Sequence, residues 1–518
     1  GGAIALEYTS VELDTSLLGA LIAASVTTTR PGGAGTVYLK GPGKTYGDLR
    51  VDNTGIPGAT ILPALGAGVA GEGSGGALLV TDRASAIPAY FAGHWVEVYD
   101  GATGALKGSA RIASVGHNGL SVTLDANVGA EPGDLWQGVY RFDDVTMTGG
   151  VTLVSDDPIR MAGDALVTAG VVRTREVRAA SLRVAPGATL THHATSDPAH
   201  PESLRIEVAE LLVEADGAID ATGVGFAPGS TYPGHGKPGT ASGGSHLGQG
   251  GVSGNPPGET FGSVYRPLEP GGGGQSSGRG GGVVRIVADR VQVDGEIRAD
   301  GESSGRAGAG GSVWIRTLAL AGTGAITAAG GEPCCGNGAG GGGAIALEYT
   351  SVELDTSLLG ALSAASVTTT RPGGAGTILL RGPDATYGDL TVDNGGVFGR
   401  ATVLPSLGAG VAQLGSGGDI VVTDRTAPIP EYFVGHWVRV ETPDRVVKGT
   451  WRISAVEGPA FALAPNGGEV IDVVEGDEWF GLYRFDSVTV TGGATLQSID
   501  PVEELLSGTV SDFQPIED

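Results

Sequence analysis

The sequence predicts an all-β protein: a parallel β-solenoid, or β-helix, with extended glycine-rich loops and two inserted small β-barrel modules. Three observations lead to this prediction. Glycine accounts for 94 of the 518 residues, or about 18 %, whereas its share in an average protein is about 7 %. Hydrophobic residues still make up 40 % of the chain, which is enough to form a core. The third observation is a long internal repeat.

The repeat covers most of the chain. Residues 3–21 recur unchanged at 344–362, an offset of 341 residues. The match continues with small insertions, which mark loops, until the two copies part after Pro158 and Pro501. The chain therefore contains one complete period and the first half of a second one.

Shorter units inside the period predict the solenoid. Each unit is a pair of short strands with alternating apolar residues, joined by a turn such as Asp216-Gly217, Asp294-Gly295 or Thr323-Gly324. The pairs are 204–208 with 218–221, 284–288 with 296–299, and 313–317 with 325–328. One pair buries little surface alone, so we expect the pairs to stack as rungs, with Ile286 and Ile297 pointing inward.

These patterns predict the domain order. Solenoid segments are expected at 1–76, 143–340 and 341–418, with one axis through both copies, and a C-terminal tail or cap at 486–518. Barrel inserts are expected at 77–142 and 419–485, because glycine becomes rarer there and five short strands follow one another. In the first insert these strands are 78–81, 95–99, 109–115, 120–124 and 136–142.

Three segments, 223–282, 302–311 and 331–343, consist largely of glycine and other small or turn-forming residues. Such composition is typical of flexible linkers. It is equally compatible with hydrogen-bonded, polyproline-II-like strands packed beside the solenoid, because only glycine lets backbones approach so closely. In that case Tyr232, Tyr265 and Pro267 are candidate anchors.

Charge and motifs exclude several functions. The net charge of −26 opposes binding to nucleic acid or to anionic membranes, and no apolar run is long enough to span a bilayer. No nucleophile elbow, P-loop or zinc motif is present, and the acidic residues are scattered rather than grouped. We therefore expect no enzyme, no catalytic residue and no cofactor, with Ca²⁺ bound at acidic turns as the alternative.

A few residues are candidates for a binding or cross-linking role. Trp95 and Trp437, each next to a histidine, could stack on sugars, although tryptophan in a small barrel is more often a core residue. Cys334 and Cys335 could form a vicinal disulfide, cross-link to a neighbour or remain free thiols. The local group of His192, His193 and His200 is more typical of a surface loop than of a metal site.

Residues 340–349, 373–381 and 387–394 resemble segments of very large, repetitive, glycine-rich surface proteins of environmental bacteria. This resemblance implies secretion, a cell-surface location and a structural or adhesive role. The glycine tracts are also similar to the glycine-rich region of the anaplastic lymphoma kinase ectodomain, in which extended glycine helices bundle.

We accordingly expect an extracellular structural protein of a bacterial surface fibre, filament or adhesin stalk. The alternative is a β-helix protein that binds or degrades polysaccharide. Because residues 1–6 reappear at 342–347, identical units are the expected partners, either in a longer polypeptide or end to end, with surface polysaccharide as a further one. The acidic tail with Glu503, Glu504, Asp512, Glu517 and Asp518 could cap one end or be donated as a strand.

Overall fold

The computed structural model describes residues 1–10, 16–253, 255–465, 467 and 469–504. Within these ranges the chain is almost entirely β-structure, with a few short 3₁₀ helices, and the large sheets are mainly parallel. The all-β solenoid class is thus confirmed. The chain forms two compact units: unit 1 comprises Gly1–Thr191 and Leu204–Ala218, and unit 2 comprises His192–Ser203 and Ile219–Asp518.

The solenoid strands of unit 1 are β1 (Ala3–Glu7), β2 (Thr36–Lys40), β3 (Asp48–Asp52), β4 (Gly58–Leu62), β11 (Val145–Thr148), β12 (Val151–Ser155), β13 (Ile159–Met161), β14 (Asp164–Val167), β15 (Gly170–Thr174), β16 (Glu176–Val184), β17 (Ala188–Thr191) and β18 (Leu204–Val213). Its barrel, called barrel 1, contains β5 (Ala67–Val69), β6 (Leu78–Val80), β7 (Trp95–Tyr99), β8 (Leu106–Val115), β9 (Ser121–Leu124) and β10 (Leu135–Phe142). The 3₁₀ helices are η1 (Ser16–Ala20) and η2 (Ala89–Phe91).

The solenoid strands of unit 2 are β20 (Val283–Val293), β21 (Glu296–Arg298), β22 (Ser312–Ala321), β23 (Ala325–Thr327), β24 (Ala344–Val352), β25 (Leu362–Ser363), β26 (Thr377–Arg381), β27 (Asp389–Asp393), β28 (Thr402–Leu404), β37 (Ser487–Thr491), β38 (Leu496–Ser498) and β39 (Val502–Glu504). Barrel 2 contains β29 (Ala409–Val411), β30 (Gly417–Gly418), β31 (Ile420–Val422), β32 (Trp437–Glu441), β33 (Val447–Glu457), β34 (Ala460–Ala464), β35 (Val473–Val474) and β36 (Glu478–Phe485). The 3₁₀ helices are η3 (Leu358–Gly360) and η4 (Glu431–Phe433), and β19 (Ala218–Asp220) lies at the boundary between the units.

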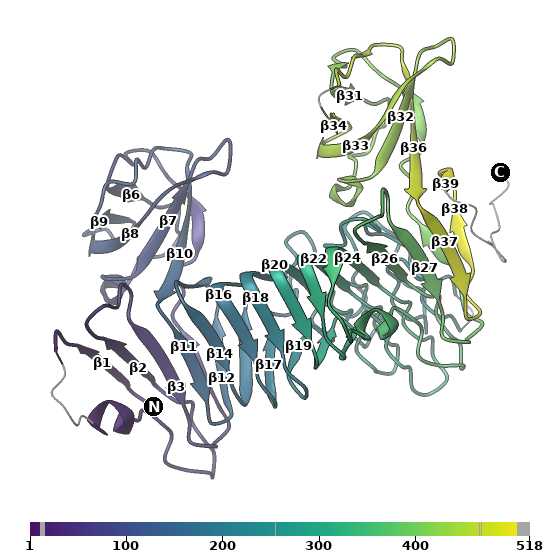
Figure 1. Ribbon diagram of the computed structural model, residues 1–518. Helices are drawn as coiled ribbons and strands as arrows, with labels where there is room; N and C mark the ends of the chain where they lie inside the picture. Colours follow the sequence, from purple (N-terminus) through teal and green to yellow (C-terminus); the bar gives the residue numbers. More distant parts are fainter. Residues whose placement is uncertain (11–15, 254, 466, 468, 505–518) are drawn as a thin grey trace. The chain divides into compact units, whose positions relative to one another are not determined.

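In-register stacking builds the core of unit 1. Strands β3, β11, β14, β16 and β18 pair in parallel and lie side by side (Figure 1). Alternate positions form inward ladders, and one of them runs from Val51 through Met147, Val167 and Val184 to Val213, all of them buried. A second parallel sheet, β4, β12, β15 and β17, closes the opposite side of the rungs.

Unit 2 uses the same construction. Strands β20, β22, β24 and β26 pair in parallel, and Ile286, Ile315 and Leu347 stack in the interior with at most 1 % exposure. The short strands β21, β23 and β25 form the second sheet, in which Ile297 is fully buried. The predicted inward orientation of Ile286 and Ile297 is confirmed.

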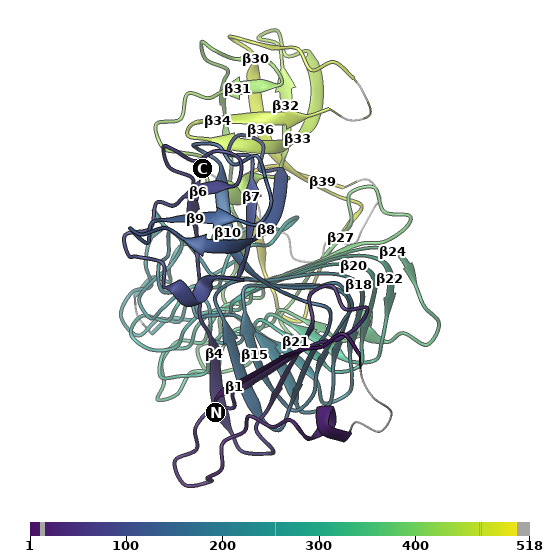
Figure 2. The same cartoon turned by 90° about the vertical axis from the view of Figure 1, so that its left-hand side faces the viewer.

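Each barrel is a closed ring of antiparallel strands. In barrel 1 the order is β5, β10, β7, β8, β9, β6, and the ring closes where the Gly71 amide donates to the Val80 carbonyl at 2.8 Å. Figure 2 shows β6 to β10 as a module apart from the rung strands β4 and β15. Barrel 2 closes in the same way, through the Gln413 amide and the Val422 carbonyl. The five strands predicted for the first insert are all present.

Large parts of the glycine-rich segments are buried and hydrogen-bonded to one another, as expected for packed extended strands. One series of amide-to-carbonyl bonds runs from Gly310 to Gly341, from Gly341 to Gly244 and from Gly244 to Ala307, each of 2.9 to 3.0 Å. A Cβ atom at Gly310 would lie 1.9 Å from the Ala328 carbonyl oxygen. Only glycine fits at such positions. The interpretation as packed, hydrogen-bonded extended strands therefore holds here, and the interpretation as flexible linkers is wrong.

Three details differ from the sequence-based expectation. Residues 487–504 form rung strands, because β37 pairs with β27 and β38 pairs with β28, so this part of the predicted tail belongs to the solenoid. Barrel 1 begins before residue 77, since β5 pairs with β10. The sheets also contain antiparallel steps, β2 with β3 and β26 with β27. The acidic residues Asp512, Glu517 and Asp518 lie outside the described residues.

Candidate functional site

Each barrel is attached to its rungs by a continuous strand and a buried aspartate. Strand β10 pairs with β7 in the barrel and then with β13 in the rung. The Asp157 carboxylate accepts hydrogen bonds from the amides of Leu65 (2.7 Å) and Gly66 (2.9 Å) and lies 3.2 Å from His94 Nε2. In unit 2, Asp500 makes the equivalent bonds to Leu407 and Gly408. These bonds fix the barrel relative to its own rungs and create a cleft at the junction.

In unit 1 this junction cleft, called cleft 1, has a volume of about 430 Å³. The indole of Trp95 packs edge to face against Tyr46, with ring centroids 5.3 Å apart. The guanidinium of Arg141 lies 5.2 Å from the Trp95 centroid and that of Arg111 lies 5.7 Å from it. Lys40 also lines the cleft, so aromatic and cationic side chains alternate along its wall.

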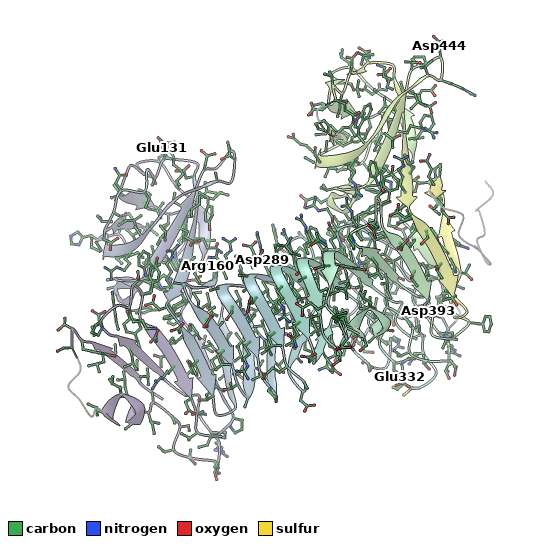
Figure 3. All side chains as sticks on the ribbon, in the orientation of Figure 1. Glu131, Arg160, Asp289, Glu332, Asp393 and Asp444 are labelled. Carbon is green, nitrogen blue, oxygen red and sulfur yellow. The ribbon has the colours of Figure 1, made fainter. Side chains whose placement is uncertain are left out.

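Buried ion pairs with Glu97 hold Arg141 and Arg160 in place. Glu97, 3 % exposed, accepts a hydrogen bond from Arg141 (2.9 Å) and one from Tyr99 (2.5 Å), and Arg160 approaches at 3.4 Å. Burial alone would raise the pKa of Glu97, but the Tyr99 hydroxyl and the two arginines lower it overall. Arg160 lies where barrel 1 meets the rungs, whereas Glu131 lies on the far side of the barrel (Figure 3).

Cleft 2, the equivalent cleft in unit 2, has a volume of about 310 Å³ and is strongly cationic. Five arginines and one glutamate line it, a formal balance of 5 − 1 = +4: Arg266, Arg285, Arg316, Arg381, Arg452 and Glu348. Register explains the convergence, because Arg316, Glu348 and Arg381 occupy successive positions of one ladder across β22, β24 and β26. Glu348 also accepts a 2.9 Å hydrogen bond from the Trp314 indole.

Aromatic rings separate these charges. The guanidinium of Arg452 lies 4.5 Å from the Trp437 centroid, and that of Arg484 lies 4.5 Å from the Tyr387 centroid. Burial lowers the pKa of Arg452. Clustered guanidinium groups in a partly enclosed cavity favour an anionic ligand, particularly one with carboxylate, sulfate or phosphate groups.

The residues singled out in the sequence have separate locations. Trp95 is partly exposed in cleft 1, whereas Trp437 is 6 % exposed, so only Trp95 retains appreciable surface for a sugar. His192 is buried and its Nε2 accepts a hydrogen bond from the Val283 amide, while His200 is exposed and pairs with Asp197. Across the residues that the structure describes, no group of three or more His, Cys, Asp or Glu side chains is arranged to hold a metal ion.

The two cysteines lie on an exposed part of the 331–343 segment. The Cys334 and Cys335 sulfur atoms are 2.7 Å apart, and this contact raises the pKa of the Cys334 thiol. Cross-linking through these residues remains a prediction.

Sequence reasoning missed the arginines of the clefts. They belong to different strands and to different halves of the repeat, so no local motif connects them. One signal was present: Arg111, Arg141 and Glu7 recur as Arg452, Arg484 and Glu348, and Lys40 recurs as Arg381. Preserved charges on outward-facing strand positions could have suggested a shared site.

Comparison with known proteins gives no family. No protein-family model and no curated protein matches the chain. Among solved structures, the tailspike protein gp49 from Pseudomonas phage LKA1 aligns over 86 % of this chain and 87 % of that chain, with 10 % sequence identity and a TM-score of 0.17. None of the helices in the described residues has the length and apolar character needed to cross a membrane.

Proposed function

We propose that the protein is a non-enzymatic, extracellular structural protein that belongs to a bacterial surface fibre, filament or adhesin stalk. The carrying observation is that the second period rebuilds the rung-and-barrel arrangement of the first. Strands β1, β2 and β3 and strands β24, β26 and β27 pair at equivalent positions, and both barrels attach through an aspartate. Repetition of an identical structural unit suits length and multivalency.

Electron microscopy of the native material, combined with intact-mass measurement, tests this proposal. We expect filaments with a regular axial repeat, or a polypeptide longer than this chain that contains further copies of the period. A native protein that is dispersed and has the 51.5 kDa mass of the present chain would contradict the proposal.

Binding of acidic polysaccharide is a second candidate function, supported by the five arginines of cleft 2. Their charge is opposite to that of the chain as a whole, which carries −26. The net negative charge of the protein repels anions in general, so an anionic ligand would be attracted only where it can reach the arginines of the cleft. Arg316 and Arg381 lie two strands apart in one ladder, with Glu348 between them, which corresponds to roughly 10 Å. Carboxylates spaced by about this distance along a polysaccharide would reach both arginines.

Calorimetric titration with alginate and with polygalacturonate tests this second candidate, with neutral dextran as the reference. The double variant Arg316→Ala with Arg381→Ala should lose at least about ten-fold in affinity, since two charge-assisted contacts are removed. The control variant Arg178→Ala with Arg183→Ala removes two half-exposed arginines from unit 1 and should bind normally. Equal losses in both variants would show non-specific attraction and contradict a site at cleft 2.

The same polysaccharides test the enzymatic alternative. Incubation followed by assays for reducing ends and unsaturated products should give no turnover. Any reproducible product formation by the pure protein would overturn the non-enzymatic assignment.

A further inference from the structure

The two barrels present matching surfaces with different exposure. Tyr90 of barrel 1 is 69 % exposed, whereas the corresponding Tyr432 of barrel 2 is 6 % exposed. Positions remote from this face do not differ: Leu106 and its counterpart Val447 are both 54 % exposed. The difference is therefore confined to one face, which in unit 2 is covered.

The glycine-rich segment 223–282, called the glycine loop, covers this face in unit 2. Its Tyr232 ring packs on Tyr432 and on Phe261, and His235 Nε2 lies 3.1 Å from the Tyr432 hydroxyl. Burial raises the pKa of Tyr232 to about 12. These aromatic residues join the core of barrel 2, together with Phe226.

A second contact fills part of cleft 2. The Tyr265 hydroxyl accepts a 2.9 Å hydrogen bond from the Arg484 amide and donates to the Arg484 carbonyl at 3.2 Å. A Cβ atom built on Gly435 would lie 3.0 Å from Arg266 Cδ, whereas one built on the corresponding Gly93 meets nothing within 4 Å. The same glycine thus faces the loop in unit 2 and open space in unit 1.

A third contact is made by backbone. The Val403 amide donates to the Leu247 carbonyl at 3.1 Å, and the Gln249 amide donates to the Ala401 carbonyl at 3.0 Å. The residue of unit 1 that corresponds to Val403 is Ile61, which is 72 % exposed.

The residues that receive the loop recur in barrel 1. Tyr432, Gly435, Arg452, Tyr483, Arg484 and Phe485 correspond to the identical residues Tyr90, Gly93, Arg111, Tyr140, Arg141 and Phe142. A face that keeps the residue set of an occupied interface has the chemistry to accept the same occupant.

We propose that this face of barrel 1, with cleft 1, is the docking surface for the glycine loop of another copy of the repeat. The inference deepens the structural function proposed above and rests on it. The incoming copy would place its Tyr265 and Arg266 in cleft 1 and its Tyr232 and Phe261 around Tyr90. Its Arg285, Trp314 and Arg316 would add the remaining side chains that line cleft 2. Each junction cleft is therefore a composite of two successive copies.

An extended protein tests the proposal. Residues 1–341 are placed directly ahead of the complete 518-residue chain, so that Gly341 precedes Gly1 as it precedes Gly342 in the native order. Both proteins carry Cys334→Ser and Cys335→Ser in every copy of the repeat that they contain. Each also carries a single Tyr90→Cys, placed in barrel 1 of its 518-residue part. We expect maleimide to label this cysteine at least about ten-fold more slowly in the extended protein, because a docked loop must open first.

Controls separate docking from other effects. A cysteine at Leu106, 54 % exposed and remote from the loop face, should label equally fast in both proteins. Tyr265→Ala in the added copy should restore fast labelling of the Tyr90→Cys site. Equal rates at Tyr90→Cys in the two proteins would overturn the docking inference. Fibre formation is judged separately by microscopy of native material, so either proposal can fail without the other.

Discussion

Individual glycines of the packed glycine-rich segments allow close backbone contact because they have no side chain. A Cβ atom on Gly280 would lie 1.8 Å from the Gly271 carbonyl oxygen, and that backbone is held by hydrogen bonds on both sides. We expect Gly280→Ala to lower the free energy of unfolding by about 3 kcal/mol or more, since two buried backbones must separate. Chemical denaturation monitored by circular dichroism measures this change.

The matched control is Gly417→Ala. Gly417 belongs to the same unit, has no positive φ, and an added Cβ meets no atom within 4 Å. It should change stability by less than about 0.5 kcal/mol. Equal changes in the free energy of unfolding at the two positions would mean that the glycine-rich segments are not closely packed in solution.

A buried carboxyl makes unit 2 sensitive to pH. Glu269 is 7 % exposed, and burial raises its pKa to about 7, although the amides of Ser263 and Leu268 donate hydrogen bonds to it. Because the folded pKa exceeds the unfolded value of about 4.3, the stabilisation is complete below about pH 4 and is lost as pH rises through 7.

We therefore expect Glu269→Gln, which stays neutral, to gain stability relative to the native protein between pH 4.5 and 7. The gain should be on the order of 2 to 3 kcal/mol. Urea denaturation across this pH range measures it. Glu332→Gln, at an exposed glutamate of the same unit, controls for the loss of one negative charge. If the Glu269 and Glu332 variants show the same pH dependence, Glu269 is not the titrating group.

At the scale of the strand, alternation decides which substitutions are tolerated. Ile286 of β20 is fully buried in a ladder with Ile315, whereas its neighbour Val287 faces outward. Ile286→Asp should abolish cooperative folding of unit 2, because it buries an unpaired charge. Val287→Asp should cost less than about 1 kcal/mol. Thermal unfolding compares the two, and similar losses would contradict the inward ladder.

The same strand shows how much of the fold could be predicted from the sequence. Alternation identified residues 284–288, but β20 continues to Val293. Asp289 and Arg290 are successive residues that are not buried, so the alternation shifts phase there and the sequence pattern ends before the strand does. In β18 the exposed pair Ala209 and Glu210 has the same effect. Local periodicity reveals the first half of each long strand and hides the second.

Candidate sites were harder to predict than strands. The pattern alone placed Trp95 and Trp437 on strands of the barrel inserts, where β7 and β32 contain them. It also gave Tyr265 as a candidate anchor of the glycine loop, and Tyr265 hydrogen-bonds to Arg484. The convergence of the arginines of cleft 2 could not be predicted in this way, because it depends on the register between β22, β24 and β26. Register is set by the stacked core and the loops, which no short window of sequence contains.

At the scale of the whole molecule, the repeat and the docking surface describe a single assembly rule. Each period would provide a barrel with an acceptor face and a glycine loop as the donor, so the contact is head to tail and does not close on itself. Heterologous contacts of this type generate open filaments rather than closed oligomers. The number of periods would then determine length.

The packed glycine loop also has a consequence for digestion and for isotope exchange. Segment 223–282 has the composition of a spacer, and spacers are cut quickly by proteases and exchange their amide hydrogens within seconds. Here the amides of Gly225, Gly272 and Gly281 are bonded to buried carbonyls. We expect these amides to exchange as slowly as those of the rung strands, and elastase or subtilisin to leave this segment intact until unit 2 unfolds. Fast exchange throughout 223–282 in the folded protein would contradict this. Close packing would thus protect from proteases a segment whose composition alone marks it as an easy target.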